Sequence, residues 1–159
     1  MVQKSGSTVS LRKENSGTLA EMTVAAAVDR VWRVLTSFEE MPAYLSSLSK
    51  CRVLKKNGAY RLVEQIARVK ISLLPLSFRV IMDVVEDRPF LHFKQRYGSF
   101  TCFRGYWQVE DCSPGTGSVV RYYLEAGMSQ GLRGRSFEQQ FHRMVKQNMK
   151  ELALWIDNS

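Results

Sequence analysis

The sequence predicts a single α+β domain, with a run of antiparallel strands in the middle of the chain and helices toward its two ends. Residues 60–126 largely alternate apolar and polar side chains between short turns, which is typical of a half-buried sheet. Residues 27–35 and 137–156 instead carry apolar side chains at helical spacing. A length of 159 residues suits one domain. We expect it to span residues 18–157, with residues 1–17 as an N-terminal extension or an extra strand.

Two short helical segments are expected after the first strand. Val28, Val31, Trp32 and Leu35 recur at the spacing of one helix face. The Met41-Pro42 pair indicates a second short helical turn, because proline is well tolerated at the first position of a helix.

Strands are predicted over residues 60–71, 78–86, 90–97, 100–109 and 118–126, separated by turns such as Arg88-Pro89. Consecutive strands joined by short turns form an antiparallel meander. Because side chains alternate across a strand, a face that contains Trp107 would also contain Phe103, and the opposite face would contain Arg104.

The C-terminal segment is the strongest predicted helix, and a glycine-containing loop at residues 127–134 precedes it. Its apolar stripe comprises Phe137, Phe141, Met144, Val145, Leu152, Trp155 and Ile156. Asn148 falls at the centre of this stripe. Because a buried amide without partners costs about 1–3 kcal/mol, we expect Asn148 to bond a strand group, a trapped water or a polar ligand atom.

Composition excludes several classes of protein. Hydrophobic residues make up 45% of the chain and charged residues 24%, which is typical of a globular domain rather than a disordered one. No apolar run reaches the roughly 18–20 residues of a membrane span, and the first residues lack the apolar region of a signal peptide. Three cysteines without a CxxC motif favour a soluble protein in a reducing compartment, the cytoplasm or a plastid stroma after removal of a transit peptide. Neither a metal nor a cofactor is expected.

Three stretches resemble the START-like (helix-grip, SRPBCC) superfamily, in its polyketide cyclase/dehydrase and coenzyme-Q-binding subgroup. They are Val-Trp-Arg-Val-Leu-Thr at 31–36 with Met-Pro-Ala-Tyr-Leu at 41–45, the strand at 78–86, and a G-x-F-x-x-F-x-G-x-W pattern at 98–107. The resemblance implies a curved antiparallel sheet of about six or seven strands wrapped around a long C-terminal helix, with a cavity between them. Ala27 departs from the proline common at that position, and Pro75 is unusual for a central strand.

The residues expected to line this cavity are mostly aromatic or apolar, as in ligand pockets generally. They are Trp32, Phe78, Met82, Phe93, Phe103, Trp107, Tyr122, Phe141, Met144 and Asn148. The alternative is that these side chains pack against one another as ordinary core.

The apolar run at residues 71–78 has two interpretations. It is either a buried strand with a bulge at Pro75, or an exposed lip at the cavity mouth that contacts a membrane or a partner. In the second case Leu74, Pro75 and Leu76, together with Gly131 and Leu132, would form a gate.

The net charge of +8 suggests contact with an anionic partner. Lys94, Arg96, Arg104 and Arg121 are predicted on the outward face of successive strands, where they would meet anionic lipid head groups or, less well supported, RNA or a ribosome. The alternative is an ordinary solvated face. No sequence feature indicates an oligomeric state.

Binding, and carriage, of a hydrophobic or amphipathic small molecule is the favoured function, with a lipid, an isoprenoid quinone or a pigment as examples. A cyclase or dehydratase of polyketide-like substrates is the first alternative, with His142, Tyr122 and Asn148 as its polar candidates. A ribosome- or protein-binding regulatory module is the second. No catalytic residues are assigned, because no Ser, Cys, His and carboxylate group shows a recognisable spacing.

Overall fold

The computed structural model describes residues 7–71, 73–113, 115–128 and 135–158. Its helical elements are α1 (Val28–Thr36), the 3₁₀ helix η1 (Phe38–Ala43) and α2 (Arg135–Asn158). Its strands are β1 (Ser10–Glu14), β2 (Gly17–Val24), β3 (Leu48–Asn57), β4 (Tyr60–Ile71), β5 (Leu74–Asp87), β6 (Phe90–Gly98), β7 (Cys102–Asp111) and β8 (Ser118–Gly127).

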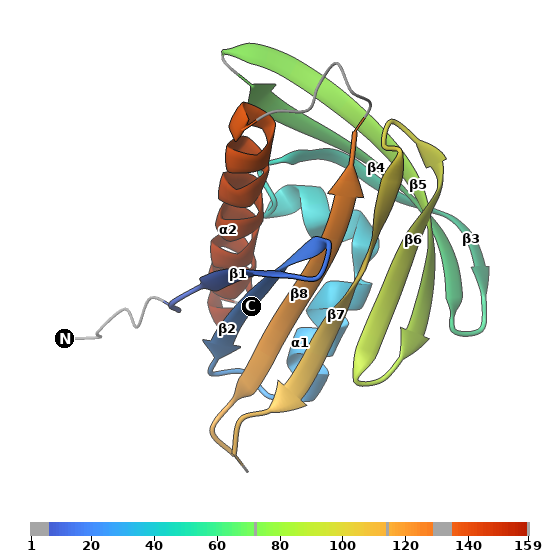
Figure 1. The fold of residues 1–159 in the computed structure, drawn as a ribbon. Helices are drawn as coiled ribbons and strands as arrows, with labels where there is room; N and C mark the ends of the chain where they lie inside the picture. The colour runs from blue at the N-terminus through green and yellow to red at the C-terminus, as the bar shows by residue number, and fades with distance from the viewer. Residues whose placement is uncertain (1–6, 72, 114, 129–134, 159) are drawn as a thin grey trace.

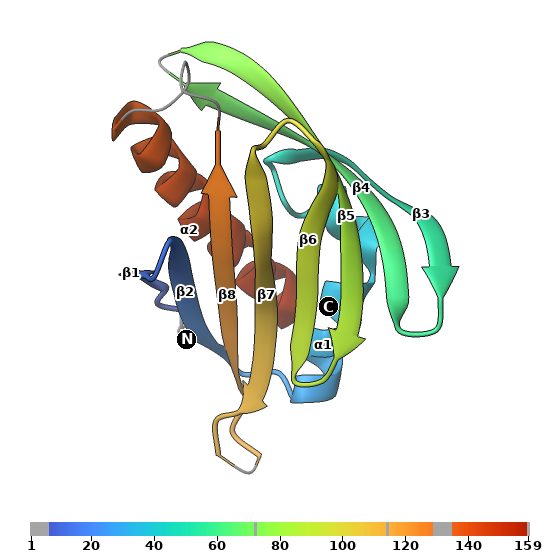
Figure 2. The same cartoon turned by 45° about the vertical axis from the view of Figure 1, so that its right-hand side comes forward.

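All of these strands belong to one antiparallel sheet with the order β1-β2-β8-β7-β6-β5-β4-β3. The curved sheet lies on one side of α2, which packs against β2 and β4 (Figures 1 and 2). This is the helix-grip arrangement. The described part of the chain has eight strands rather than the expected six or seven. The difference arises because Ser10–Glu14 pairs with β2, and because the lysine-rich β3, whose pattern is mostly polar, pairs with β4.

The core lies between the sheet and α2. Val145, Met149, Leu152 and Ile156 are buried on the face of α2 that meets the sheet, and their spacing of four, three and four residues is that of one helix stripe. The C-terminal end of α2 is held by Arg30 on α1, whose Nη2 donates a hydrogen bond of 2.6 Å to the Ile156 carbonyl oxygen. The sheet, α1 and α2 are therefore held together around a single core.

The β4–β5 hairpin extends past its neighbouring strands. Pairing of β3 with β4 ends at Ala67, and pairing of β6 with β5 ends at Val80, so among the described residues no further strand pairs with the tip of the hairpin. Leu73 and Leu74 at this tip are 93% and 60% exposed. In Figures 1 and 2 the tip lies at the same end of the molecule as the start of α2.

The hairpin corrects one interpretation of the apolar run. Pro75 is exposed and pairs in regular register opposite Lys70, so residues 71–78 are not a buried strand with a bulge. Proline is tolerated here because, within the described ranges, this part of β5 pairs with β4 alone. Leu74 and Pro75 are exposed and Leu76 is half-buried. Gly131 and Leu132, the other two residues of the expected gate, lie outside the described residues.

Candidate ligand-binding cavity

An internal cavity of about 110 Å³ lies between the inner face of the sheet and α2. Strands β4 to β8 contribute most of its wall, and α2 and η1 close it from the other side. Nine of the ten residues expected from the sequence line it: Phe78, Met82, Phe93, Phe103, Trp107, Tyr122, Phe141, Met144 and Asn148. The strand phase assumed in the sequence analysis therefore agrees with the inward face of the sheet.

Trp32 is the exception. It is buried on α1, which packs against β7, and the Arg88 guanidinium lies 5.0 Å from its ring centroid. Among the described residues that line the cavity, Trp32 is absent. Helical spacing predicted its burial correctly, but the position of α1 places the ring in the core beneath the β5–β6 turn instead.

Sequence reasoning missed several lining residues. Phe100 lies just before β7, and the polar Gln65 and Gln140 look like surface residues when sequence alone is considered. Gln65 is turned inward by the alternation of β4, where its neighbours Val63 and Ala67 also face inward. The alternation of Val63, Gln65 and Ala67 along residues 60–71 indicates that Gln65 faces inward. It was missed because glutamine is usually a surface residue.

A continuous set of aromatic rings forms the sheet side of the cavity. Trp107 stacks on Tyr122 with ring centroids 4.1 Å apart, and Phe93 lies 5.9 Å from Tyr122 and 5.7 Å from Phe103. Burial raises the pKa of the Tyr122 phenol, so it stays protonated at neutral pH. The wall therefore offers flat apolar surface and one neutral hydroxyl to a ligand.

Polar groups gather at the side of the cavity toward α2 and the loop after η1. Asn148 Oδ1 accepts a hydrogen bond of 2.9 Å from Ser47 Oγ. The partner of Asn148 Oδ1 is therefore a loop hydroxyl, which was not among the three expected partners, a strand group, a trapped water and a polar ligand atom. Within the described chain, its Nδ2 donates no hydrogen bond, which leaves an amide donor at the cavity wall.

A buried thiol lies beside the cavity but is not activated. Gln65 Nε2 is 3.6 Å from both Cys51 Sγ and Met41 Sδ. Burial raises the pKa of the Cys51 thiol to about 11, so it stays protonated at neutral pH. We therefore assign Cys51 a structural role. Of the two residues, Gln65 lines the cavity.

Two further hollows adjoin the cavity. One, of about 280 Å³, lies between β4 and α2 and shares Ser47, Val69, Gln140, Met144 and Asn148 with the cavity. We call it the vestibule. The cavity alone is smaller than the roughly 300–1,000 Å³ of typical ligand pockets, and the vestibule lies against it across the five shared residues.

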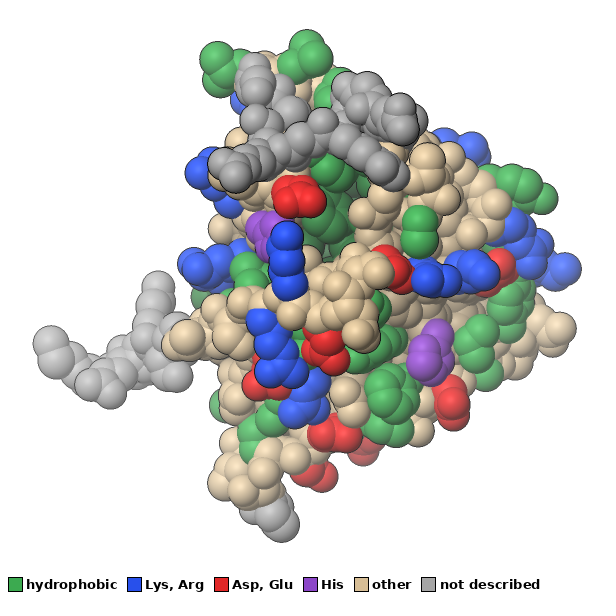
Figure 3. All heavy atoms as spheres, in the orientation of Figure 1, with side chains coloured by type: hydrophobic (Ala, Val, Ile, Leu, Met, Phe, Trp, Pro, Cys, Tyr) green, Lys and Arg blue, Asp and Glu red, His purple; other side chains and the backbone are tan. Residues whose placement is uncertain are grey.

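The second hollow is a groove of about 480 Å³ between the β1–β2 turn and the start of α2. Figure 3 shows a hollow on this face, with hydrophobic side chains at its floor and charged and histidine side chains near its rim. His142, Lys13 and Glu138 line the groove, and Phe137 and Phe141 separate it from the cavity. His142 is therefore placed outside the cavity.

Residues 24–153 match the family model described as polyketide cyclase/dehydrase and lipid transport. The chain belongs to this family. No curated protein matches it by sequence.

Members of the START superfamily share its fold. A START superfamily protein from Mycobacterium smegmatis superposes with a TM-score of 0.76 at 13% identity, over 91% of this chain and 99% of that one. The Zhui aromatase/cyclase from Streptomyces sp. R1128 gives 0.70 at 14%, over 93% and 94%. Human StAR-related lipid transfer protein 5 gives 0.69 at 9%, over 99% and 89%. At these identities the likeness establishes the fold alone.

The outer face of strands β6 to β8 carries acidic partners for most of the expected basic residues. Ion pairs join Arg96 to Asp83 at 2.8 Å, Arg104 to Glu125 at 2.5 Å, and Arg121 to both Glu21 and Glu110 at 2.7 and 3.0 Å. Lys94 is exposed nearby. The four basic residues do lie outward, but neighbouring strands supply acids that neutralise three of them. Contact of this face with an anionic partner stays a prediction.

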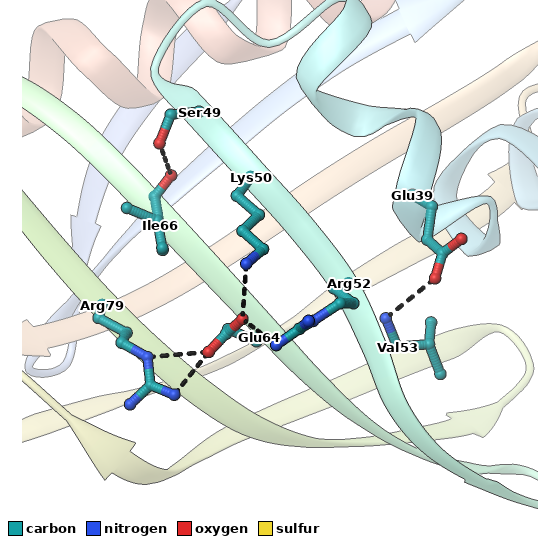
Figure 4. A network of polar contacts seen from close by, with 8 residues as sticks. All are labelled: Glu39, Ser49, Lys50, Arg52, Val53, Glu64, Ile66 and Arg79. Carbon is teal, nitrogen blue, oxygen red and sulfur yellow. Dashed lines mark hydrogen bonds and ion pairs between the residues drawn. The ribbon is translucent and has the colours of Figure 1, made fainter.

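The outer face of β3, β4 and β5 carries an excess of positive charge around one acid. Lys50, Arg52 and Arg79 all converge on Glu64, as Figure 4 shows. Glu64 is 3% exposed and accepts two hydrogen bonds from the Arg79 guanidinium, at 2.6 and 2.8 Å. Arg68 and Lys70, farther along β4 toward the hairpin tip, border the vestibule. One carboxylate thus serves three cations, and the surface keeps a net positive charge.

Among the described residues, no helix combines the length and hydropathy needed to cross a bilayer.

Proposed function

We propose that the protein binds a hydrophobic or amphipathic small molecule, such as a lipid, an isoprenoid quinone or a pigment, in the cavity under α2 and carries it between membranes or partners. The observation that carries this proposal is the aromatic wall of Phe93, Phe103, Trp107 and Tyr122. Burying apolar ligand surface there contributes about 25 cal/mol per Å².

The chemistry of the lining favours binding over catalysis. Among the described residues that line the cavity, Tyr122 is the one titratable side chain, and its raised pKa keeps it neutral. A general acid or base works best with a pKa near the operating pH. His142 lies in the groove beyond Phe141. The polar groups of the cavity can therefore orient a ligand by hydrogen bonds, which is what a binding protein requires.

Filling the cavity tests this proposal. Ala67 lines the cavity from β4, so Ala67→Phe would place a ring in the space that the ligand occupies. We expect a hydrophobic molecule to co-purify with the wild-type protein, prepared without detergent, and to be lost from this variant by about tenfold or more. Mass spectrometry of an organic extract measures it.

The matched control is Ala59→Phe, which adds the same ring at an exposed position of the β3–β4 turn. It should retain the ligand, and circular dichroism should show both variants folded. A clean extract from the wild type, together with no uptake of the neutral dye N-phenyl-1-naphthylamine, would contradict the proposal.

Carriage requires a place where the ligand enters and leaves, and we propose the β4–β5 tip for this role. Leu73 and Leu74 are exposed beside the basic outer face of β4, a combination that suits the surface of an anionic membrane. Leu74, Pro75 and Leu76 would then form one side of the gate to the vestibule.

Removing the two exposed leucines tests this role. We expect the double variant Leu73→Asn, Leu74→Asn to bind vesicles of phosphatidylcholine and phosphatidylglycerol about tenfold more weakly, because two apolar side chains no longer enter the bilayer. Asparagine also tolerates the positive φ of 68° at position 73. Vesicle co-sedimentation measures binding, with Leu154→Asn, at a 57% exposed site on α2, as the control. Unchanged binding would show that the tip does not dock.

A further inference from the structure

Among the described residues that line the vestibule between β4 and α2, three are cationic and none is acidic. Arg68 and Lys70 line it from β4 and Arg143 lines it from α2, and its remaining lining is neutral. None of the ion pairs formed within the described chain includes any of these three cations. This contrasts with the arginines of β6 to β8, each of which has a carboxylate partner.

The neutral part of the lining is rich in hydrogen-bond donors. Ser47, Gln140 and Asn148 line the vestibule and the cavity together. The Asn148 carbonyl oxygen is already occupied by Ser47 Oγ, so the amide presents its Nδ2 donors. Three cations and free amide donors around one hollow match the acceptor oxygens of an anion.

The position of the vestibule defines what else the ligand must contain. Val69 and Met144 also border both spaces, so a ligand with its head in the vestibule would pass these two residues to place its tail in the apolar cavity. The ligand that fits is an amphiphile with a small charged head and an apolar tail.

We propose that the vestibule is the head-group site for an anionic amphiphile, with Arg68, Lys70 and Arg143 around a carboxylate or phosphate head and the tail in the cavity. This inference rests on the proposed function of the cavity. It narrows the ligand class from hydrophobic molecules in general to those with an acidic head.

Three ligands with the same ten-carbon tail test the proposal: decanoate, decyl phosphate and decanol. Each is titrated against protein loaded with N-phenyl-1-naphthylamine, and the loss of dye fluorescence reports displacement. We expect the wild-type protein to bind both anions about tenfold or more tightly than decanol at low salt, since a charged head gains charge-assisted hydrogen bonds. Either order of the two anions supports an anionic head-group site, and the tighter one identifies its chemistry.

The triple variant Arg68→Gln, Lys70→Gln, Arg143→Gln should reduce the preference for anions to within about threefold and leave decanol binding unchanged. Lys56→Gln, at an exposed position on β3 outside the vestibule lining, is the control and should retain the preference. Equal binding of decanol and the anions by the wild type, or a preference that survives in the folded triple variant, would overturn the head-group site and leave the cavity function intact. Failure of the dye and all three ligands to bind would overturn both.

Discussion

Gly105→Ala is expected to destabilise the protein by about 3 kcal/mol or more, because a side chain at this position has no room. A Cβ on Gly105 would lie 1.9 Å from the Tyr123 carbonyl oxygen and 2.9 Å from Phe93 Cζ. The first of these atoms is backbone of the neighbouring strand β8, so the β7–β8 pair itself would have to move. The second belongs to the aromatic wall of the cavity.

Urea or thermal unfolding measures the effect, which for a chain of this size corresponds to a fall in Tm of about 6–12 °C. Gly127→Ala is the matched control on β8. Its Cβ would first meet Thr101 Oγ1 at 2.9 Å, a side-chain atom that can rotate away, so we expect a loss below about 1 kcal/mol. Equal losses in the two variants would show that crowding at Gly105 is not the cause.

The same substitution should also weaken ligand binding. The added methyl group displaces the Phe93 ring, which lies between Phe103 and Tyr122 in the wall. The absence of a side chain at Gly105 thus allows the Phe93 ring and the β8 backbone to pack directly against β7.

Glu64→Gln should cost about 1–2 kcal/mol at neutral pH, because it removes the one carboxylate shared by Lys50, Arg52 and Arg79. This expected loss of stability is modest for a carboxylate that is only 3% exposed. The reason is that the three cations are about half exposed, so water screens their charge. Urea unfolding of the two proteins at matched pH measures the difference.

The difference should depend on pH in one direction. Hydrogen bonds from Arg79, followed by the charges of Arg79, Arg52 and Lys50, lower the pKa of Glu64 below its ordinary value of 4.5, against the opposing effect of burial. Its stabilising contribution is therefore fully present above that value and is lost as the pH falls through the lower pKa of the folded state. Between pH 5 and 8 the difference between wild type and variant should be constant, and below about pH 4.5 it should shrink. A difference that grows on acidification would contradict this assignment.

Much of the cavity could be predicted because side-chain alternation links each strand residue to a face of the sheet. Once Trp107 was assigned to the inner face, Phe103 on the same strand followed, and the same rule on adjacent strands gave Phe93 and Tyr122. The periodicity of α2 placed Phe141, Met144 and Asn148 toward the sheet for the same kind of reason. These repeats follow from the geometry of a single strand or helix, so they are visible in the sequence without knowledge of the tertiary structure.

Charge neutralisation could not be predicted in this way. Arg104 pairs with Glu125 because β7 and β8 place these residues opposite each other, and Arg121 pairs with Glu21 because β8 and β2 do the same. Sequence shows the cations on each strand, but the partner of each depends on the register between strands. The arginines of β6 to β8 are therefore paired with acids, whereas no carboxylate in the described part of the chain forms an ion pair with Arg68, Lys70 or Arg143.

The sequence by itself determined the fold class, the order of the main elements, and which face of most strands and of α2 meets the core, because these follow from short repeats along the chain. Only the tertiary structure decided that the β4–β5 hairpin extends beyond β3 and β6, that Trp32 lies outside the cavity, and that Arg68, Lys70 and Arg143 border one hollow. These features depend on strand lengths, helix placement and side chains distant in the chain, and so they arise only when the elements pack together.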